Sequence, residues 1–221
     1  SFAKKLVHMR SYNGKPLDYL AREVREYYHL RFPNTEKIIY DARGVGDSFS
    51  RFFDQEWLDN TTGKEYPPLV VDDEPLMNAS AKQVLHPFRA VNTLNQRIYT
   101  NLRVALEQRT IELPVQERIA KANQADIEDN SLRLTPEQMA IFLEADALQY
   151  EMGNIVEKTS SAGNKTYDVP HAGQHKDRYS SVAMANDYIC ELEKENKRNL
   201  RNNEVYIGEV GRLPAMKSRR W

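Results

Sequence analysis

The chain has 221 residues, a net charge of −1, 40% hydrophobic residues and one cysteine, Cys190. This length suffices for one domain with a substantial core. No apolar run approaches the ~18 residues that span a bilayer, so we expect no membrane partner. The single cysteine excludes an internal disulfide and fits a reducing compartment. The near-zero charge argues against tight DNA binding by bulk electrostatics.

Hydrophobic spacing predicts that helices and strands alternate in the first half of the chain. The stretch at 74–92 carries no clear period and is expected to be irregular. The expected elements are, in order, a strand at 5–10, a helix at 16–29, a buried strand from Lys37 to Tyr40, a short helix at 46–57 and a strand at 69–71.

The second half continues the pattern, and we expect residues 1–200 to form one α/β domain followed by a polar to basic tail at 201–221. The polar stretch at 117–133 offers little to bury and is predicted to be a mobile loop. The expected elements are a helix at 95–108, a strand at 110–113, a helix with a capping box of Thr135 and Gln138, a hairpin of 154–160 with 165–169, and a helix that opens at Asp177.

Two segments place an aspartate at the edge of an element. Asp41 ends the buried strand and leads into a turn in which Gly44 and Gly46 are expected to supply unusual backbone angles. Asp177 opens the late helix, whose apolar face fixes the first turn against the core. A carboxylate held in this way can bind a metal ion.

These segments resemble the nuclease domain of the large terminase subunit of tailed bacteriophages. That family has a strand ending in Asp before a Gly-x-Gly turn, and later an acidic residue that opens a helix of small and apolar residues. The likeness covers most of residues 5–197 and departs from the family at Lys176, where a second acidic residue usually stands. The matching segments are 41–46, 97–106 running into 110–114, and 176–185.

The resemblance implies an RNase H-like α/β fold with a central mixed sheet flanked by helices. The family's first metal-binding aspartate lies on the opening strand of the domain, and no such strand precedes residues 5–10. We therefore expect the chain to lack its first strand or strands, and the third carboxylate to lie upstream of Ser1. Glu112 and Asp72 are weaker candidates within the chain.

The implied chemistry is phosphodiester hydrolysis with two Mg²⁺ or Mn²⁺ ions, which prefer carboxylate oxygens. Asp41 and Asp177 are the expected metal ligands and catalytic residues. His175 is a candidate for proton transfer. The cations that flank the two aspartates form the candidate DNA-binding groove: Arg43, Lys176 and Arg178.

The implied function is cutting concatemeric viral DNA during genome packaging in the host cytoplasm. The implied partners are double-stranded DNA, the portal protein, the small terminase subunit and an ATPase motor domain upstream in the same polypeptide, because this chain has no phosphate-binding Gly-x-x-x-x-Gly-Lys-Ser/Thr loop. Without the third carboxylate, we expect weak or no cleavage by this chain alone. Two alternatives stay open, namely a noncatalytic RNase H-like module that docks on DNA or the portal, and another RNase H-like recombination nuclease.

Overall fold

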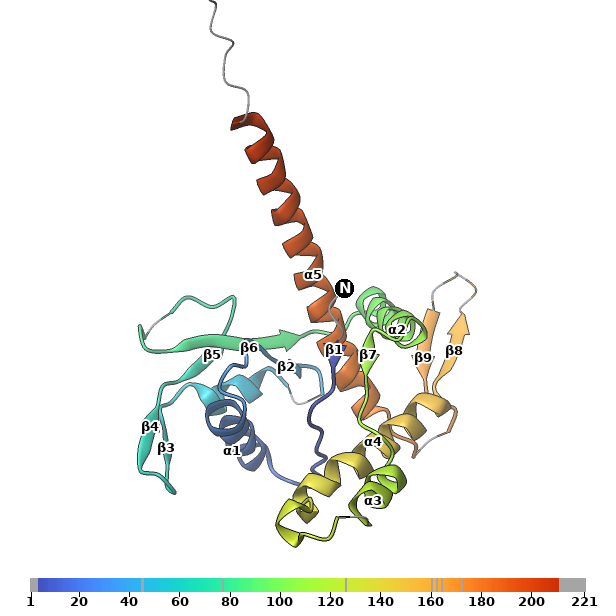
Figure 1. The fold of residues 1–221 in the computed structure, drawn as a ribbon. Helices are drawn as coiled ribbons and strands as arrows, with labels where there is room; N and C mark the ends of the chain where they lie inside the picture. The colour runs from blue at the N-terminus through green and yellow to red at the C-terminus, as the bar shows by residue number, and fades with distance from the viewer. Residues whose placement is uncertain are drawn as a thin grey trace, which may run out of the picture.

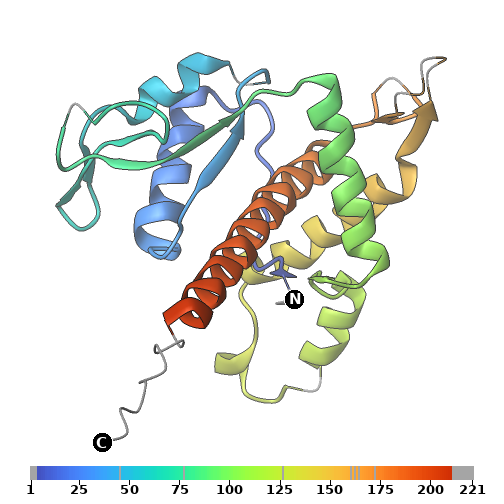
Figure 2. The same ribbon diagram turned by 90° about the horizontal axis from the view of Figure 1, so that it is seen from above.

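The computed structural model describes residues 4–210 except 45, 77, 126, 160, 162, 164 and 172, and for residues 47, 130 and 201–210 it describes the backbone only. The chain is an α/β protein (Figure 1). The long helix α5 (Asp177–Val210) runs between a half built on a sheet and a half built on helices (Figure 2).

The main sheet has the strand order β2-β6-β5, with β2 (Ile38–Asp41), β6 (Lys82–Phe88) and β5 (Leu69–Val71). Both pairings are parallel, so this three-stranded sheet is parallel among the described residues. The sequence analysis had predicted a mixed sheet. Asp41 pairs with Phe88 at the carboxyl ends of β2 and β6. The sheet therefore delivers Asp41 to the edge where parallel strands usually present functional groups.

Strand β6 is the main element that the sequence did not predict. It contains Pro87, and proline cannot donate a hydrogen bond within a sheet. The carbonyl of Leu85 accepts from Asp72 N on the β5 side, and that of Phe88 accepts from Ala42 N on the β2 side. Because sides alternate along a strand, Pro87 faces the β5 side beyond the end of β5, where no donor is needed.

The sheet half has its own core. The predicted helix at 16–29 is confirmed as α1 (Leu17–Glu26), which passes into a π-helical turn at Tyr27–Arg31. The predicted helix at 46–57 is a 3₁₀ helix at Asp47–Phe53, and an unpredicted hairpin follows with β3 (Trp57–Asp59) and β4 (Lys64–Tyr66). The buried side chains of this core include Ala21, Tyr28, Tyr40, Phe49, Phe53, Leu69 and Leu85.

The helical half packs α2 (Asn92–Glu107) and α4 (Pro136–Asn154) against α5. The predicted capping box is confirmed, since Gln138 N donates to Thr135 Oγ1 and Thr135 N donates to Gln138 Oε1. The predicted hairpin is also confirmed as β8 (Val156–Thr159) and β9 (Lys165–Asp168). The second core includes Phe88, Ile98, Tyr99, Leu102, Leu148, Tyr167, Tyr179, Val182 and Ala183.

Two further sequence predictions were wrong. The strand at 5–10 is reduced to β1 (Lys4–Lys5), which pairs with β7 (Ile111–Glu112). The stretch at 117–133 holds helix α3 (Glu117–Ala125) and a 3₁₀ turn at Asn130–Leu132. This polar helix forms because it docks on α4, where Ala120 is buried and Glu117 N donates to Asp146.

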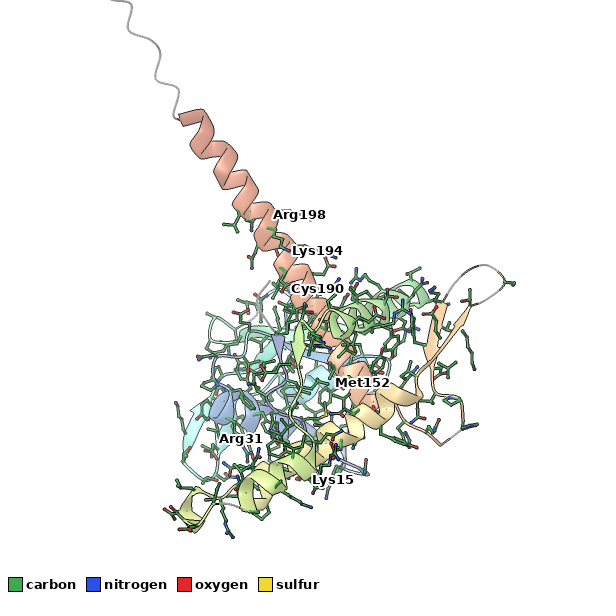
Figure 3. The ribbon with its side chains drawn as sticks, turned by 45° about the vertical axis from the view of Figure 1, so that its right-hand side comes forward. Lys15, Arg31, Met152, Cys190, Lys194 and Arg198 are labelled. Atoms are coloured by element: carbon green, nitrogen blue, oxygen red, sulfur yellow. The ribbon has the colours of Figure 1, made fainter. Side chains whose placement is uncertain are left out.

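Helix α5 begins at Asp177 as predicted, but it is longer than expected. Its backbone continues to Val210, so residues 201–210 of the predicted tail are helical, whereas residues 211–221 lie outside the described residues. Lys194 and Arg198 lie on the part of α5 that projects from the rest of the molecule (Figure 3). No helix in the described part of the chain is both long and apolar enough to cross a membrane.

Candidate functional site

Asp41 is the last residue of β2, and its side chain is exposed. Its Oδ1 accepts a hydrogen bond of 3.0 Å from Arg43 N, which closes a turn around the carboxylate. The following backbone is tied to the neighbouring strand, because Ala42 N donates to Phe88 O at 3.1 Å. The carboxylate is thus positioned by a backbone group, and among the described residues no hydrogen bond to its Oδ2 is recorded.

The two glycines of the Asp41 turn serve different purposes. Gly46 has a φ of 83°, the left-handed conformation that the sequence led us to expect. Gly44 does not have a positive φ. A Cβ atom at Gly44 would instead lie 3.0 Å from Asp41 Oδ2 and 3.3 Å from its Cγ. Gly44 is therefore needed to let the backbone approach the carboxylate.

Asp177 and Asp41 line the same hollow, which has a volume of about 520 Å³. Asp41 enters it from the end of β2 and Asp177 from the first turn of α5, and α5 packs against β2. Asp177 is also exposed. Neither carboxylate is held in an ion pair with a residue that the structure describes, so both are available to a cation.

The rest of this hollow, which we call the central hollow, has a polar wall on one side and an apolar floor. Asn95 and Tyr99 of α2 and Ser180 and Ser181 of α5 supply the polar groups. The hydroxyls of Tyr99 and Ser180 lie 2.9 Å apart in a hydrogen bond. The apolar groups are Ile39, Phe88, Ala90, Ile98 and Met184. The carboxylates thus stand beside groups that donate hydrogen bonds.

The first turn of α5 is fixed by Glu151 of α4, a carboxylate that is only 5% exposed. Its Oε2 accepts from Tyr179 N at 3.0 Å, and its Oε1 accepts from Arg178 at 2.8 Å. A backbone N–H of a helix's first turn has no partner within the helix, so a carboxylate there satisfies the donor and favours the helix dipole. Glu151 therefore acts as a distant cap that holds the residues next to Asp177.

Arg178, a predicted DNA contact, also binds Glu144 of α4, at 2.6 Å. Glu144 accepts two further hydrogen bonds from the backbone and hydroxyl of Ser11. Burial opposes ionisation of Glu144, but the hydrogen bonds from Arg178 and Ser11 outweigh it and lower the pKa of the carboxyl. The guanidinium of Arg178 is thus matched by two carboxylates, which gives it a structural role that the sequence did not indicate.

Lys176 is likewise matched within the protein. Its Nζ donates to Tyr167 O at 2.8 Å, lies 3.0 Å from Asp168 Oδ1 and stands over the Tyr99 ring. The hydrogen bond from Lys176 lowers the pKa of Asp168. Lys176 lines the central hollow, but its ammonium group is already paired with Asp168.

The other predicted residues differ in their placement. His175 lines a neighbouring hollow together with Asp177, but it does not line the central hollow that contains Asp41. Arg43 has an exposed side chain two residues after Asp41. Of the three candidate DNA-binding cations, Arg43 is the one for which the structure records no carboxylate partner among the described residues.

Neither in-chain candidate for a third carboxylate lies in the central hollow. Asp72 is engaged by Lys37 Nζ at 2.8 Å and by His86 Nδ1 at 2.9 Å. Glu112 pairs with Lys5 at 2.9 Å. Within the described part of the chain, no set of three Asp, Glu, His or Cys residues is grouped so as to hold a metal ion.

A second buried carboxylate, Asp187, holds the middle of α5 against α2. Asp187 is 4% exposed and accepts hydrogen bonds from Arg97, at 3.2 and 2.7 Å, and from Asn101, at 2.9 Å. The sequence analysis did not single out Asp187. Its partners come from another helix, so no local pattern reveals them.

The chain was compared with protein-family models, with curated proteins and with solved structures, and no significant match was found in any of the three comparisons.

Proposed function

We propose that this chain is the nuclease domain of a tailed-bacteriophage large terminase subunit, a metal-dependent endonuclease that cuts concatemeric viral DNA during packaging. The observation that carries the proposal is the meeting of Asp41 and Asp177 in the central hollow. The family resemblance selects these two residues from distant segments, and both line one hollow with no ion-pair partner among the residues that the structure describes. Structural capping roles for the two aspartates do not require them to share a hollow.

The proposal includes an RNase H-like fold. The parallel pair of β2 and β6 with Asp41 at its carboxyl end, and a late helix packed against β2 with an acid in its first turn, both agree with this fold. Within the described residues, β2 pairs with β6 on one side and carries no strand on the other. We propose that a strand of the parent protein pairs with this edge and brings the third carboxylate.

The donor chemistry of the central hollow fits Mg²⁺ or Mn²⁺ as far as two ligands go. Asp41 and Asp177 offer oxygen atoms, which hard divalent ions prefer, and Gly44 leaves the Asp41 carboxylate accessible. Bound there, divalent ions supply an activated water and stabilise the leaving oxygen of a phosphodiester. Because two carboxylates line this hollow among the described residues, one fewer than the reaction needs, the chain alone is expected to cleave slowly or not at all.

The chain's own residues have distinct tasks in this proposal. Asp41 and Asp177 provide the negative charge that draws cations to the phosphate, and Glu151 with Arg178 holds the α5 turn in place. Arg43 is the proposed DNA contact beside Asp41, and His175, which lines the neighbouring hollow together with Asp177, is the proposed proton carrier. The partners remain double-stranded DNA, the portal, the small subunit and an upstream ATPase motor, in the host cytoplasm.

A second candidate function is a noncatalytic docking module for DNA or the portal. The observation that favours it is that the described residues supply two carboxylates and no third ligand. In that case, Asp41 and Asp177 would not bind a divalent ion tightly, and DNA binding would not depend on one.

Plasmid nicking tests the proposal. The full chain is incubated with supercoiled plasmid and Mn²⁺, alongside Asp41→Asn, Asp177→Asn and the matched control Asp73→Asn, an exposed aspartate outside the central hollow. We expect slow nicking that both site variants abolish and the control retains. Nicking that survives Asp41→Asn would exclude this site.

A further inference from the structure

The central hollow shares different lining residues with two neighbouring hollows. It shares Asp177 and Ser181 with a larger hollow of about 640 Å³, whose other wall is the segment 8–13; we call this the Arg10 hollow. It shares Asn95, Tyr99 and Lys176 with a smaller hollow of about 150 Å³ at the start of α2, which we call the α2 hollow. The three together cross the first turn of α5.

The Arg10 hollow offers a cation to an anionic ligand. Arg10 is exposed, and it lies 3.5 Å from the Tyr27 hydroxyl and 3.9 Å from Glu23. These distances leave it less tightly engaged than Arg178, which lines the same hollow from α5 and binds two carboxylates at 2.6 and 2.8 Å. Arg10 is therefore the group in this wall that is best able to contact a phosphate.

The α2 hollow offers neutral donors instead. Both lysines that line it form ion pairs: Lys165 lies 2.6 Å from Glu157, and Lys176 lies 3.0 Å from Asp168. The other polar side chains of α2 in its lining are Tyr99, whose hydroxyl is hydrogen-bonded to Ser180, and the amides of Asn92, Asn95 and Gln96. Amide groups bind phosphate oxygens by hydrogen bonds without adding charge.

We propose, building on the proposed nuclease function, that one DNA strand lies along the three hollows and crosses the first turn of α5. Arg10 contacts a phosphate on one side of the Asp41–Asp177 pair, and Asn95 contacts a phosphate on the other side. A strand held on both sides presents an internal phosphodiester to the aspartates. The substrate is therefore a continuous strand rather than a strand end.

Fluorescence anisotropy with a short fluorescein-labelled DNA duplex in Ca²⁺ tests this path, using the full chain at several salt concentrations. Arg10→Ala is expected to weaken binding roughly tenfold and to reduce the slope of log affinity against log salt by about 0.9, because one phosphate contact is lost. Arg10→Lys should restore the slope. Asn95→Ala is expected to weaken binding about fivefold with the slope unchanged.

Two variants on α3, which lines none of the three hollows, serve as matched controls: Arg118→Ala and Asn123→Ala. Both should bind as the unaltered chain does. If Arg10→Ala and Asn95→Ala also bind normally while Asp41→Asn removes the Ca²⁺-dependent binding, the path is wrong and the proposed nuclease function stands. If the unaltered chain binds no DNA in Ca²⁺, both are overturned.

Discussion

Two pairs of carboxylates in this molecule have opposite surroundings. Glu151 and Asp187 are buried at 5% and 4% exposure and are surrounded by donors. Asp41 and Asp177 are exposed, face one hollow and have no cation bound to them in an ion pair among the described residues. The buried pair fixes helix α5 to α4 and α2, whereas the exposed pair faces the central hollow from the end of β2 and the first turn of α5.

This difference separates stability from function. A buried carboxylate with matched partners cannot be removed without leaving its partners unsatisfied, so its loss destabilises the fold. Asp41 and Asp177 are exposed, and neither is paired with a cation among the described residues, so neutralising either one should cost the fold little. The comparison therefore predicts that the two pairs respond in opposite ways to neutralising substitutions.

The largest expected effect is on the exposed pair. Asp41→Asn or Asp177→Asn should lower Mn²⁺ affinity by at least about 100-fold, because even groups that only support a metal ligand contribute 10- to 100-fold. The free energy of unfolding should change by less than about 0.5 kcal/mol, since neither side chain is buried. Electron paramagnetic resonance of free Mn²⁺ and urea denaturation measure the two quantities. A large loss of stability in either variant would show that the exposed carboxylates, like the buried pair, hold the fold together.

Substitution of Glu151 should have the reverse outcome. Glu151→Ala leaves the backbone N–H of Tyr179 without its partner and Arg178 with Glu144 alone, and should destabilise the protein by about 3–5 kcal/mol. Urea denaturation gives this value, with Glu128→Ala, an exposed glutamate, as the control. Equal costs for the two variants would show that Glu151 does not hold the α5 turn.

Asp187→Ala should have a smaller effect than Glu151→Ala. Its main partner, Arg97, is about half exposed and can be solvated when the carboxylate is lost. We expect a loss of about 1.5–3 kcal/mol, the typical contribution of hydrogen bonds to a charged group. The same denaturation experiment ranks the two variants, and a reversed order would contradict the burial argument.

A pH effect follows from Glu144. Its pKa is below the ordinary value of 4.5, so the folded state holds the proton less tightly than the unfolded state. The stability that Glu144 contributes is therefore fully present above pH 4.5 and is lost as the pH falls through the folded-state value. Denaturation midpoints measured down this range should fall more steeply in the unaltered chain than in Glu144→Gln.

The smallest predicted effect tests how the Asp41 turn is built. Gly44→Ala places a Cβ 3.0 Å from Asp41 Oδ2 and forces the carboxylate to move by a few tenths of an ångström. Mn²⁺ affinity should fall by less than about tenfold, with little change in stability. Gly153→Ala is the control, because nothing lies within 4 Å of its added Cβ. An unchanged Mn²⁺ affinity in Gly44→Ala would show that Gly44 does not contribute to metal binding.

The sequence predicted the positions of Asp41 and Asp177 because both depend on local signals. A short apolar run followed by glycines places Asp41 at a strand end, and an apolar stripe places Asp177 at a helix start. The capping box of Thr135 and Gln138 was found for the same reason. Short-range patterns such as these do not require knowledge of the neighbouring elements.

The parts that sequence reasoning missed depend on contacts between distant segments. Strand β6 carries Pro87, which is tolerated only because β5 ends before it. Helix α3 is polar and forms against α4. Arg178 is predicted as a DNA contact from its place beside Asp177, yet its partners Glu144 and Glu151 lie on another helix. None of these arrangements has a periodic signature in the sequence.

The joint metal site of Asp41 and Asp177 is tested most directly by soaking crystals of this chain in Mn²⁺ and recording anomalous diffraction. The proposed site predicts an anomalous peak in the central hollow that contacts both carboxylates. Crystals of Asp41→Asn treated in the same way should lose this peak. Carboxylates that remain apart, with no peak between them at saturating Mn²⁺, would contradict the nuclease proposal and favour the docking module.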